Sequence, residues 1–440
     1  MRKITPSHVH GTLRRHVLLA GGELVPDLAK SRDSYIVDAR DGSRYLDFHG
    51  LFGSIPLGFN HPRLNEGAFI NKLGRMAVHK PSSAELATIE MAEFVDAFSR
   101  VGIPETLPHL FVIEGESLAV ESALKTAFDW KVRKNLAKGL PESTGNRVVH
   151  FRHAHHGCSG YTLSLTNTAA PLQTQYYPVF DWPRVASPFA RFPLEGANLR
   201  DTEDREIQAV ADLRSILRER RDEIAAVIIE PIQCEGGDNH FRSEFFRELR
   251  RACDEFEALL ILDETSTGVG ITGKFWCHEH HEVTPDVVIF GSHLPVPGIL
   301  VGPRIEEVEG HVFSEPARLR SAWGGHLVDM ARAARILEIV EADKLVENAA
   351  EQGEGLLSGL KRIAEKEERI TNLRGRGLLV AFDLPTGDAR DTFLAKAKAE
   401  GLLALSAGHR TVRFRPALSV SKKEIEHGLD VIYETLHGLS

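Results

Sequence analysis

The stretch LLILDETSTGVG, residues 259–270, is a short apolar run that ends in polar residues and glycines. A second stretch, DVVIFGSHLPVPG at residues 286–298, has the same pattern. Short apolar runs that end in loops are typical of strands buried on both faces of a parallel sheet. Functional groups in such folds gather beyond the carboxyl ends of the strands. The two stretches therefore predict strands whose ends open onto a cleft.

Further apolar runs at residues 110–113, 147–151 and 225–229 alternate with helical patterns. This alternation predicts a mostly parallel sheet with helices on both faces. Residues 35–47 contain two short strand patterns around the turn Ala39-Arg40-Asp41-Gly42, which predict a hairpin. Helices are expected over residues 9–19 and, with apolar residues at helical spacing, over 330–340.

We expect three segments along the chain: an N-terminal part of a small domain (1–75), a large α/β domain (76–329) and a C-terminal small domain (330–440). The small domain would be α+β and discontinuous, because both chain ends contribute to it.

Composition limits the classes of partner. The 440 residues are 42% hydrophobic and 26% charged, with a formal net charge of -9, which argues against nucleic acid. No apolar run approaches the ~20 residues of a membrane helix, and the first residues lack a secretory signal. The four cysteines are too few and too scattered for a disulfide framework. We therefore expect a cytoplasmic protein that binds neither nucleic acid nor membrane.

Motifs dispersed along the chain carry a family resemblance. The sequence resembles class III aminotransferases of the pyridoxal-phosphate (PLP) fold type I, and among them L-lysine 6-aminotransferases. The matching segments, in order, are LGFNHP (57–62), ALKTAFDW (123–130), HGCSGYTLSLTNT (156–168), EPIQ (230–233), WGG (323–325), RGRG (374–377) and VRFRP (412–416). The resemblance implies an aspartate-aminotransferase-like fold, an amino-acid-like substrate and a homodimer.

One position departs from the family in its chemistry. The family has a lysine in the loop after Phe290-Gly291, where it binds the cofactor as a Schiff base. This chain has Ser292-His293 there, and no lysine occurs between Lys274 and Lys344. Because a Schiff base needs a primary amine, we expect a homologue that lacks this lysine and cannot carry out lysine-tethered transamination.

The resemblance also implies residues around the cofactor. Gly115 and Ser117 precede a helix whose backbone N–H groups could hold a phosphate, and Ser321 lies in a further phosphate-contacting segment. Asp263 is the carboxylate that would pair with the pyridine nitrogen. Glu116, however, places a carboxylate where the family has a small residue, and it would repel a phosphate unless it points away.

Other cleft positions are also changed. His155 stands where an aromatic ring would stack on the pyridine, and Cys158 replaces an arginine that would bind a substrate carboxylate. Thr265 and Ser266 replace groups that would contact the ring, and Ala322 lacks a hydroxyl that would contact the phosphate. Since these changes all act on one ligand, we expect them to compound.

A metal site is one hypothesis for this cleft. His155, His293, Asp263 and Glu116 together match the ligand set of a divalent transition metal such as iron or zinc. The alternative is that the two histidines merely fill a vacated cavity. The metal hypothesis requires the ring nitrogens to converge on one point.

Three functions follow. The first is a repurposed enzyme in which His293, His155, Asp263 and Glu235 act on a substrate that is amino-acid-like and possibly lysine-derived. The second is a dehydratase-type enzyme that uses untethered pyridoxamine phosphate with His293 as base. The third is a non-catalytic partner or regulator of an active aminotransferase. For the first function, the expected substrate contacts are Arg415, Glu235 and Phe52.

Overall fold

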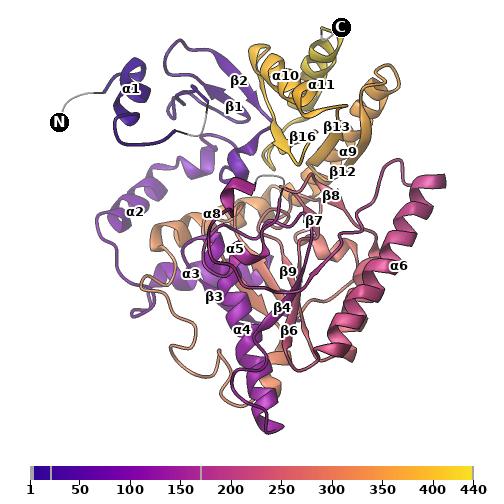
Figure 1. Ribbon diagram of the computed structural model, residues 1–440. Coiled ribbons are helices and arrows are strands. Elements are labelled where there is room, and N and C mark those ends of the chain that lie inside the picture. The colour runs from indigo at the N-terminus through magenta and orange to yellow at the C-terminus, as the bar shows by residue number, and fades with distance from the viewer. Residues whose placement is uncertain (1–3, 20–21, 169–170, 439–440) are drawn as a thin grey trace.

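The computed structural model describes residues 4–19, 22–168 and 171–438. Its centre is a seven-stranded sheet (Figure 1). In spatial order the strands are β3 (His109–Val112), β11 (Gly298–Val301), β10 (Val287–Phe290), β9 (Leu259–Asp263), β6 (Ile224–Ile229), β4 (Arg147–Phe151) and β5 (Arg184–Val185). Strands β10, β9, β6, β4 and β5 pair in parallel, whereas β11 is antiparallel to both its neighbours.

Every residue of β6, β9 and β10 is buried, because helices cover both faces of the sheet. Ile228 and Ile261 pack in one core with α4 (Glu116–Ala137). Leu260 and Leu262 point to the other face, against α6 (Gly196–Glu219) and α7 (Ser243–Glu255). Alternate side chains of one strand therefore belong to two different cores, which explains the continuous apolar runs.

The C-terminal part forms a second, antiparallel sheet. Its strands, in spatial order, are β12 (Thr371–Arg376), β13 (Leu379–Asp383), β16 (Thr411–Phe414) and β15 (Leu405–Ala407). Three helices accompany it: α9 (Leu345–Ala364), α10 (Gly387–Ala399) and α11 (Lys422–His437). The short strands β7 (Ile232–Gln233) and β8 (Asn239–His240) form a separate pair.

The two chain ends meet in a third sheet. The predicted hairpin is confirmed as β1 (Tyr35–Val37) and β2 (Arg44–Asp47). Strand β14 (Leu402–Leu403) pairs in parallel with β2, so the first and last quarters of the chain lie side by side (Figure 1). The segment division at 75/76 and 329/330 stays a prediction.

The remaining helices are α1 (Val9–Leu13), α2 (Gly67–Ala77), α3 (Ile89–Val101), α5 (Thr162–Leu165) and α8 (Leu327–Ala342). The helix predicted over residues 9–19 is shorter than expected. It ends at Leu13 and buries none of its residues, so packing does not extend it. Within the described residues, no helix is long and apolar enough to cross a membrane.

The predicted fold class is confirmed: a large α/β unit with a mostly parallel sheet, joined to an α+β unit built from both chain ends.

Candidate functional site

Asp263 is the last residue of β9 and lies at the carboxyl end of the central sheet. One carboxylate oxygen is 2.7 Å from Nδ1 of His156. The other accepts hydrogen bonds from the backbone N–H (3.1 Å) and the hydroxyl (2.8 Å) of Thr265. Asp263 is buried, and its carboxylate is held in one orientation by these three contacts.

His155 lies beside a second buried carboxylate, Glu230, which follows β6. The backbone N–H of His155 donates to Glu230 Oε1 at 2.8 Å. Burial, with a contribution from the Asp263 carboxylate, raises the pKa of Glu230 well above its usual range. Burial also lowers the pKa of His155. The His155 ring is therefore neutral, and its Nδ1 is buried without a hydrogen-bond partner in the part of the chain that the structure describes.

The loop after β10 places Ser292 and His293 against two other segments. The backbone N–H and hydroxyl of Ser292 both donate to Glu116 Oε1 at 2.6 Å. His293 is buried against Gly53, where an added Cβ would lie 3.1 Å from the imidazole Nε2. Burial, together with the nearby charge of Arg415, lowers the pKa of His293 to about 3, so its ring is neutral at pH 7.

Two buried arginines, Arg413 in β16 and Arg415 directly after it, belong to the site. Fully buried Arg413 pairs with Glu235 at 2.7 Å and with Asp238 at 3.4 Å. Burial opposes ionisation of Glu235, but Arg413 outweighs it and lowers the pKa of Glu235. Arg415 is also buried, and its Nε and Nη1 have no protein partner among the described residues.

The predicted phosphate contacts lie at the N-terminus of α4. Gly115 has φ +94° and precedes the helix, and Glu116 is in its first turn. The Glu116 carboxylate bonds to Ser292, so it is turned toward the loop after β10. Ser117 packs against Gly157, whose added Cβ would lie 2.2 Å from the Ser117 hydroxyl.

The other two predicted residues are placed differently. Ser321 donates to Glu114 (3.0 Å) and accepts from Gly324 N–H (2.7 Å), so its hydroxyl is occupied within its own turn region. Phe52 is 58% exposed and packs edge-on against His49 at 5.2 Å between ring centroids. Phe52 is therefore accessible to a ligand, whereas the Ser321 hydroxyl already has both a donor and an acceptor.

The predicted metal site is wrong. Over the described residues, no group of three or more His, Cys, Asp or Glu side chains could hold a metal ion. Asp263 bonds to His156 and Thr265, whereas Glu116 bonds to Ser292. The four proposed ligands therefore do not converge.

Three residues of the site were missed by the sequence reasoning: His156, Glu230 and Arg413. His156 and Arg413 lie one and two positions from residues that were singled out, within the segments HGCSG and VRFRP. The motifs marked the right segments, but the pairings span 107 and 178 residues and had no local signal.

Comparisons with known proteins show which family this chain resembles along nearly its whole length. The sequence profile of the family described as aminotransferase class-III matches residues 20–436. The chain is 45% identical over 437 residues to the L-lysine-epsilon aminotransferase of Mycobacterium tuberculosis, covering 99% of this chain and 96% of the relative. It is 43% identical over 436 residues to that of Amycolatopsis lactamdurans, covering 97% and 95%. The solved lysine aminotransferase from M. tuberculosis in the internal aldimine form matches with a TM-score of 0.96 and 44% identity, covering 99% of this chain and 100% of that chain.

These comparisons overturn the expected function. Identity of 43–45% along nearly the whole chain with lysine aminotransferases points to a transaminase. It contradicts a repurposed non-transaminase, an untethered dehydratase-type enzyme and a silent partner. The sequence reasoning gave the replaced cleft residues more weight than the agreement over the rest of the chain.

The expected cofactor is corrected as well. The solved relative is in the internal aldimine form, which contradicts the expectation of a metal or of pyridoxamine phosphate in place of covalent PLP. The absence of a metal-ligand cluster from the described residues removes the iron or zinc alternative.

Proposed function

Because the chain belongs to the class III aminotransferase family, we propose that it transfers the terminal amino group of an amino acid of the L-lysine type. One observation carries this proposal: a buried arginine with free donors beside a carboxylate. Within the part of the chain that the structure describes, Arg415 Nε and Nη1 have no partner, and these donors suit a substrate carboxylate. Glu235 is 38% exposed at its side chain and can accept from a substrate ammonium group.

One end of the cleft fits a pyridoxal-type cofactor. Asp263 would hold the protonated ring nitrogen, and His156 and Thr265 keep its carboxylate in place. His155 Nδ1 and His156 Nε2 are buried and have no hydrogen-bond partner among the described residues. Such atoms are unusual in a folded protein, and they support a ligand at this position. When bound, the cofactor supplies an electron sink for the carbon that bears the amino group.

The loop after β10 carries Ser292 and His293 in place of a lysine. The imidazole of His293 is not a primary amine, and the sequence holds no lysine from residue 275 to residue 343. We propose that this chain lacks the lysine that its relatives have in this loop. His293 stays a proposed site residue, because its ring is buried and its Nδ1 has no hydrogen-bond partner among the described residues.

Two further expectations stay proposals. A homodimer is supported by exposed apolar side chains in one region of the chain, Leu86 (60% exposed) and Ile89 (76%). The cytoplasmic location rests on the sequence alone.

The test measures glutamate formed from 2-oxoglutarate and L-lysine by the purified chain with added PLP. We expect lysine-dependent glutamate formation, and Arg415→Met should raise the KM for lysine about tenfold or more, since a charged hydrogen bond is lost. Arg251→Met, which removes an exposed arginine of α7, is the matched control. Cofactor binding without any glutamate formation would contradict the proposal.

Borohydride reduction followed by peptide mass spectrometry tests the loop separately. A cofactor-modified lysine peptide would refute the proposal that the attachment lysine is missing. Unmodified lysines in a protein that still binds the cofactor would support it.

A further inference from the structure

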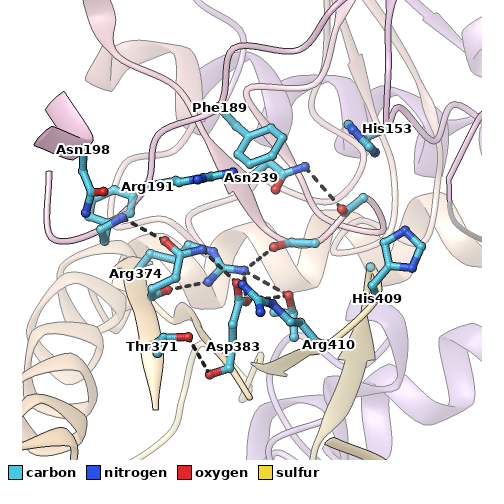
Figure 2. Close-up of a pocket in the computed structure, with 16 residues that line it drawn as sticks. His153, Phe189, Arg191, Asn198, Asn239, Thr371, Arg374, Asp383, His409 and Arg410 are labelled. Carbon is cyan, nitrogen blue, oxygen red and sulfur yellow. Dashed lines mark hydrogen bonds and ion pairs between the residues drawn. The ribbon is translucent and has the colours of Figure 1, made fainter. Parts of the chain in front are cut away.

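A cavity lies between the large α/β unit and the C-terminal sheet, and Asp263 is not among its lining residues (Figure 2). Its volume is about 370 Å³, room for roughly ten water molecules. Its lining includes residues of the segment between β5 and α6, of β12 and of the turn between β15 and β16. The Gly236-Gly237 segment also lines it.

Positive charge exceeds negative charge in this cavity. Its lining contains three arginines, Arg191, Arg374 and Arg410, and one carboxylate, Asp383, which gives a formal charge of 3 - 1 = +2 with histidines neutral. His153 and His409 also line it and lie on one side in Figure 2. Burial lowers the pKa of His153, and the nearby guanidinium of Arg152 lowers it further.

The carboxylate of Asp383 already has an ion-pair partner and two hydrogen-bond donors. Asp383 pairs with Arg374 at 2.9 Å and accepts from Thr411 at 2.8 Å and from Asn372 at 3.0 Å. Arg410 reaches it only at 3.7 Å with a half-exposed side chain. Little of the Arg410 charge is therefore neutralised.

The charge of Arg191 is neutralised even less than that of Arg410. It is exposed and has neither an ion-pair nor a hydrogen-bond partner within residues 4–19, 22–168 and 171–438. A guanidinium group presents several donors in a fixed fork that suits carboxylate and phosphate oxygens. Two incompletely neutralised guanidinium groups at the mouth of one polar cavity thus create a site for more than one oxyanion group.

We propose that this cavity binds a small polyanion, a molecule that carries at least two phosphate or carboxylate groups. Arg191 and Arg410 contact the ligand, and buried Arg374 neutralises the Asp383 carboxylate. The site is distinct from the cleft at Asp263 but adjoins its substrate end. The Gly408 N–H, at the cavity wall, donates to the Glu235 carbonyl at 3.1 Å.

Isothermal titration of the full chain, saturated with PLP to occupy the other phosphate site, tests this proposal with pyrophosphate and with citrate. We expect one of the two probes to bind with one-to-one stoichiometry. Arg191→Ala and Arg410→Ala should each raise its Kd by at least about tenfold. Arg251→Ala, an exposed arginine of α7 outside the cavity, should change the Kd less than about twofold.

The two probes distinguish the ligand class: tighter binding of pyrophosphate assigns a phosphorylated ligand, and tighter binding of citrate assigns a polycarboxylate. Thermal unfolding of each variant confirms that it is folded, and Arg374 is left intact because it also bonds to backbone carbonyls of Gly237 and Asp238. Binding that both cavity variants retain would place the anion elsewhere and overturn the proposal. Absence of binding for both probes would also overturn it. Neither result depends on aminotransferase activity.

Discussion

Replacing Arg413 with methionine tests the charge balance of the buried site. Arg413 is fully buried and contacts two carboxylates, Glu235 at 2.7 Å and Asp238 at 3.4 Å. At 3.4 Å and an effective dielectric constant of about 20, one such pair contributes about 5 kcal/mol of Coulomb energy. Methionine keeps most of the volume, so the change removes mainly charge.

The expected loss of stability is about 3–5 kcal/mol, as found when one partner of a buried ion pair is removed. It stays below the summed Coulomb energies because Asp238 can take up a proton. Burial already raises the pKa of Asp238 despite its arginine neighbours. With an unfolding entropy of about 2.1 cal/mol/K per residue over 440 residues, 1 kcal/mol corresponds to roughly 1 °C.

Thermal unfolding at pH 7 should therefore show a midpoint about 3–5 °C lower for Arg413→Met. The double variant Arg413→Met/Asp238→Asn should lose less, because the uncompensated buried carboxylate is gone. Arg251→Met is the control, with an expected change below about 0.5 °C, since its side chain is 69% exposed. A midpoint for Arg413→Met equal to that of this control would refute the reasoning.

Three further outcomes are expected at the cleft. Burial lowers the pKa of His293 to about 3 in the folded chain, below its unfolded value, so its contribution to stability is lost as pH falls from about 6.5 toward 3. His293→Gln should flatten this part of a plot of thermal midpoint against pH. An unchanged slope would count against a buried neutral ring. Thr265→Val removes the 2.8 Å hydrogen bond to Asp263 and should weaken PLP binding by about fivefold in a spectroscopic titration, whereas Thr265→Ser should retain it. Burial raises the pKa of Glu230 and so favours its protonated form. Glu230→Gln should therefore leave the thermal midpoint within about 1 °C, whereas Glu230→Ala should lower it by about 2 °C or more, because the hydrogen bond from His155 is lost. Equal losses for the two variants would indicate an ionised Glu230.

The strands of the central sheet could be predicted because their cause is local. Residues 147–151 form β4 as expected, and the run at 259–262 is followed by Asp263 at the end of β9. Each apolar run has to bury both faces, and that requirement is visible within five or six neighbouring residues. The position of Asp263 at the cleft followed from the same pattern.

The groups that Asp263 contacts could not be predicted in the same way. Grouping it with His155, His293 and Glu116 assumed that side chains of one cleft share one centre. In the folded chain, Asp263 bonds to His156, one residue further along than His155, and Glu116 bonds to Ser292. In an extended segment neighbouring side chains point in opposite directions, so a shift of one residue decides which side chain enters the site.

The amino-acid sequence by itself determined the α/β fold, the family resemblance and the absence of a lysine between residues 274 and 344, because each depends on residue type and short-range pattern. Only the tertiary structure decided that Arg413 rather than Arg415 pairs with Glu235, and that Arg191 and Arg410 line one cavity. The Arg413–Glu235 pair joins residues 178 positions apart, and the cavity brings together residues that lie 219 positions apart in the sequence. Proximity at such separations depends on how the packed elements lie against each other, which no short-range pattern shows.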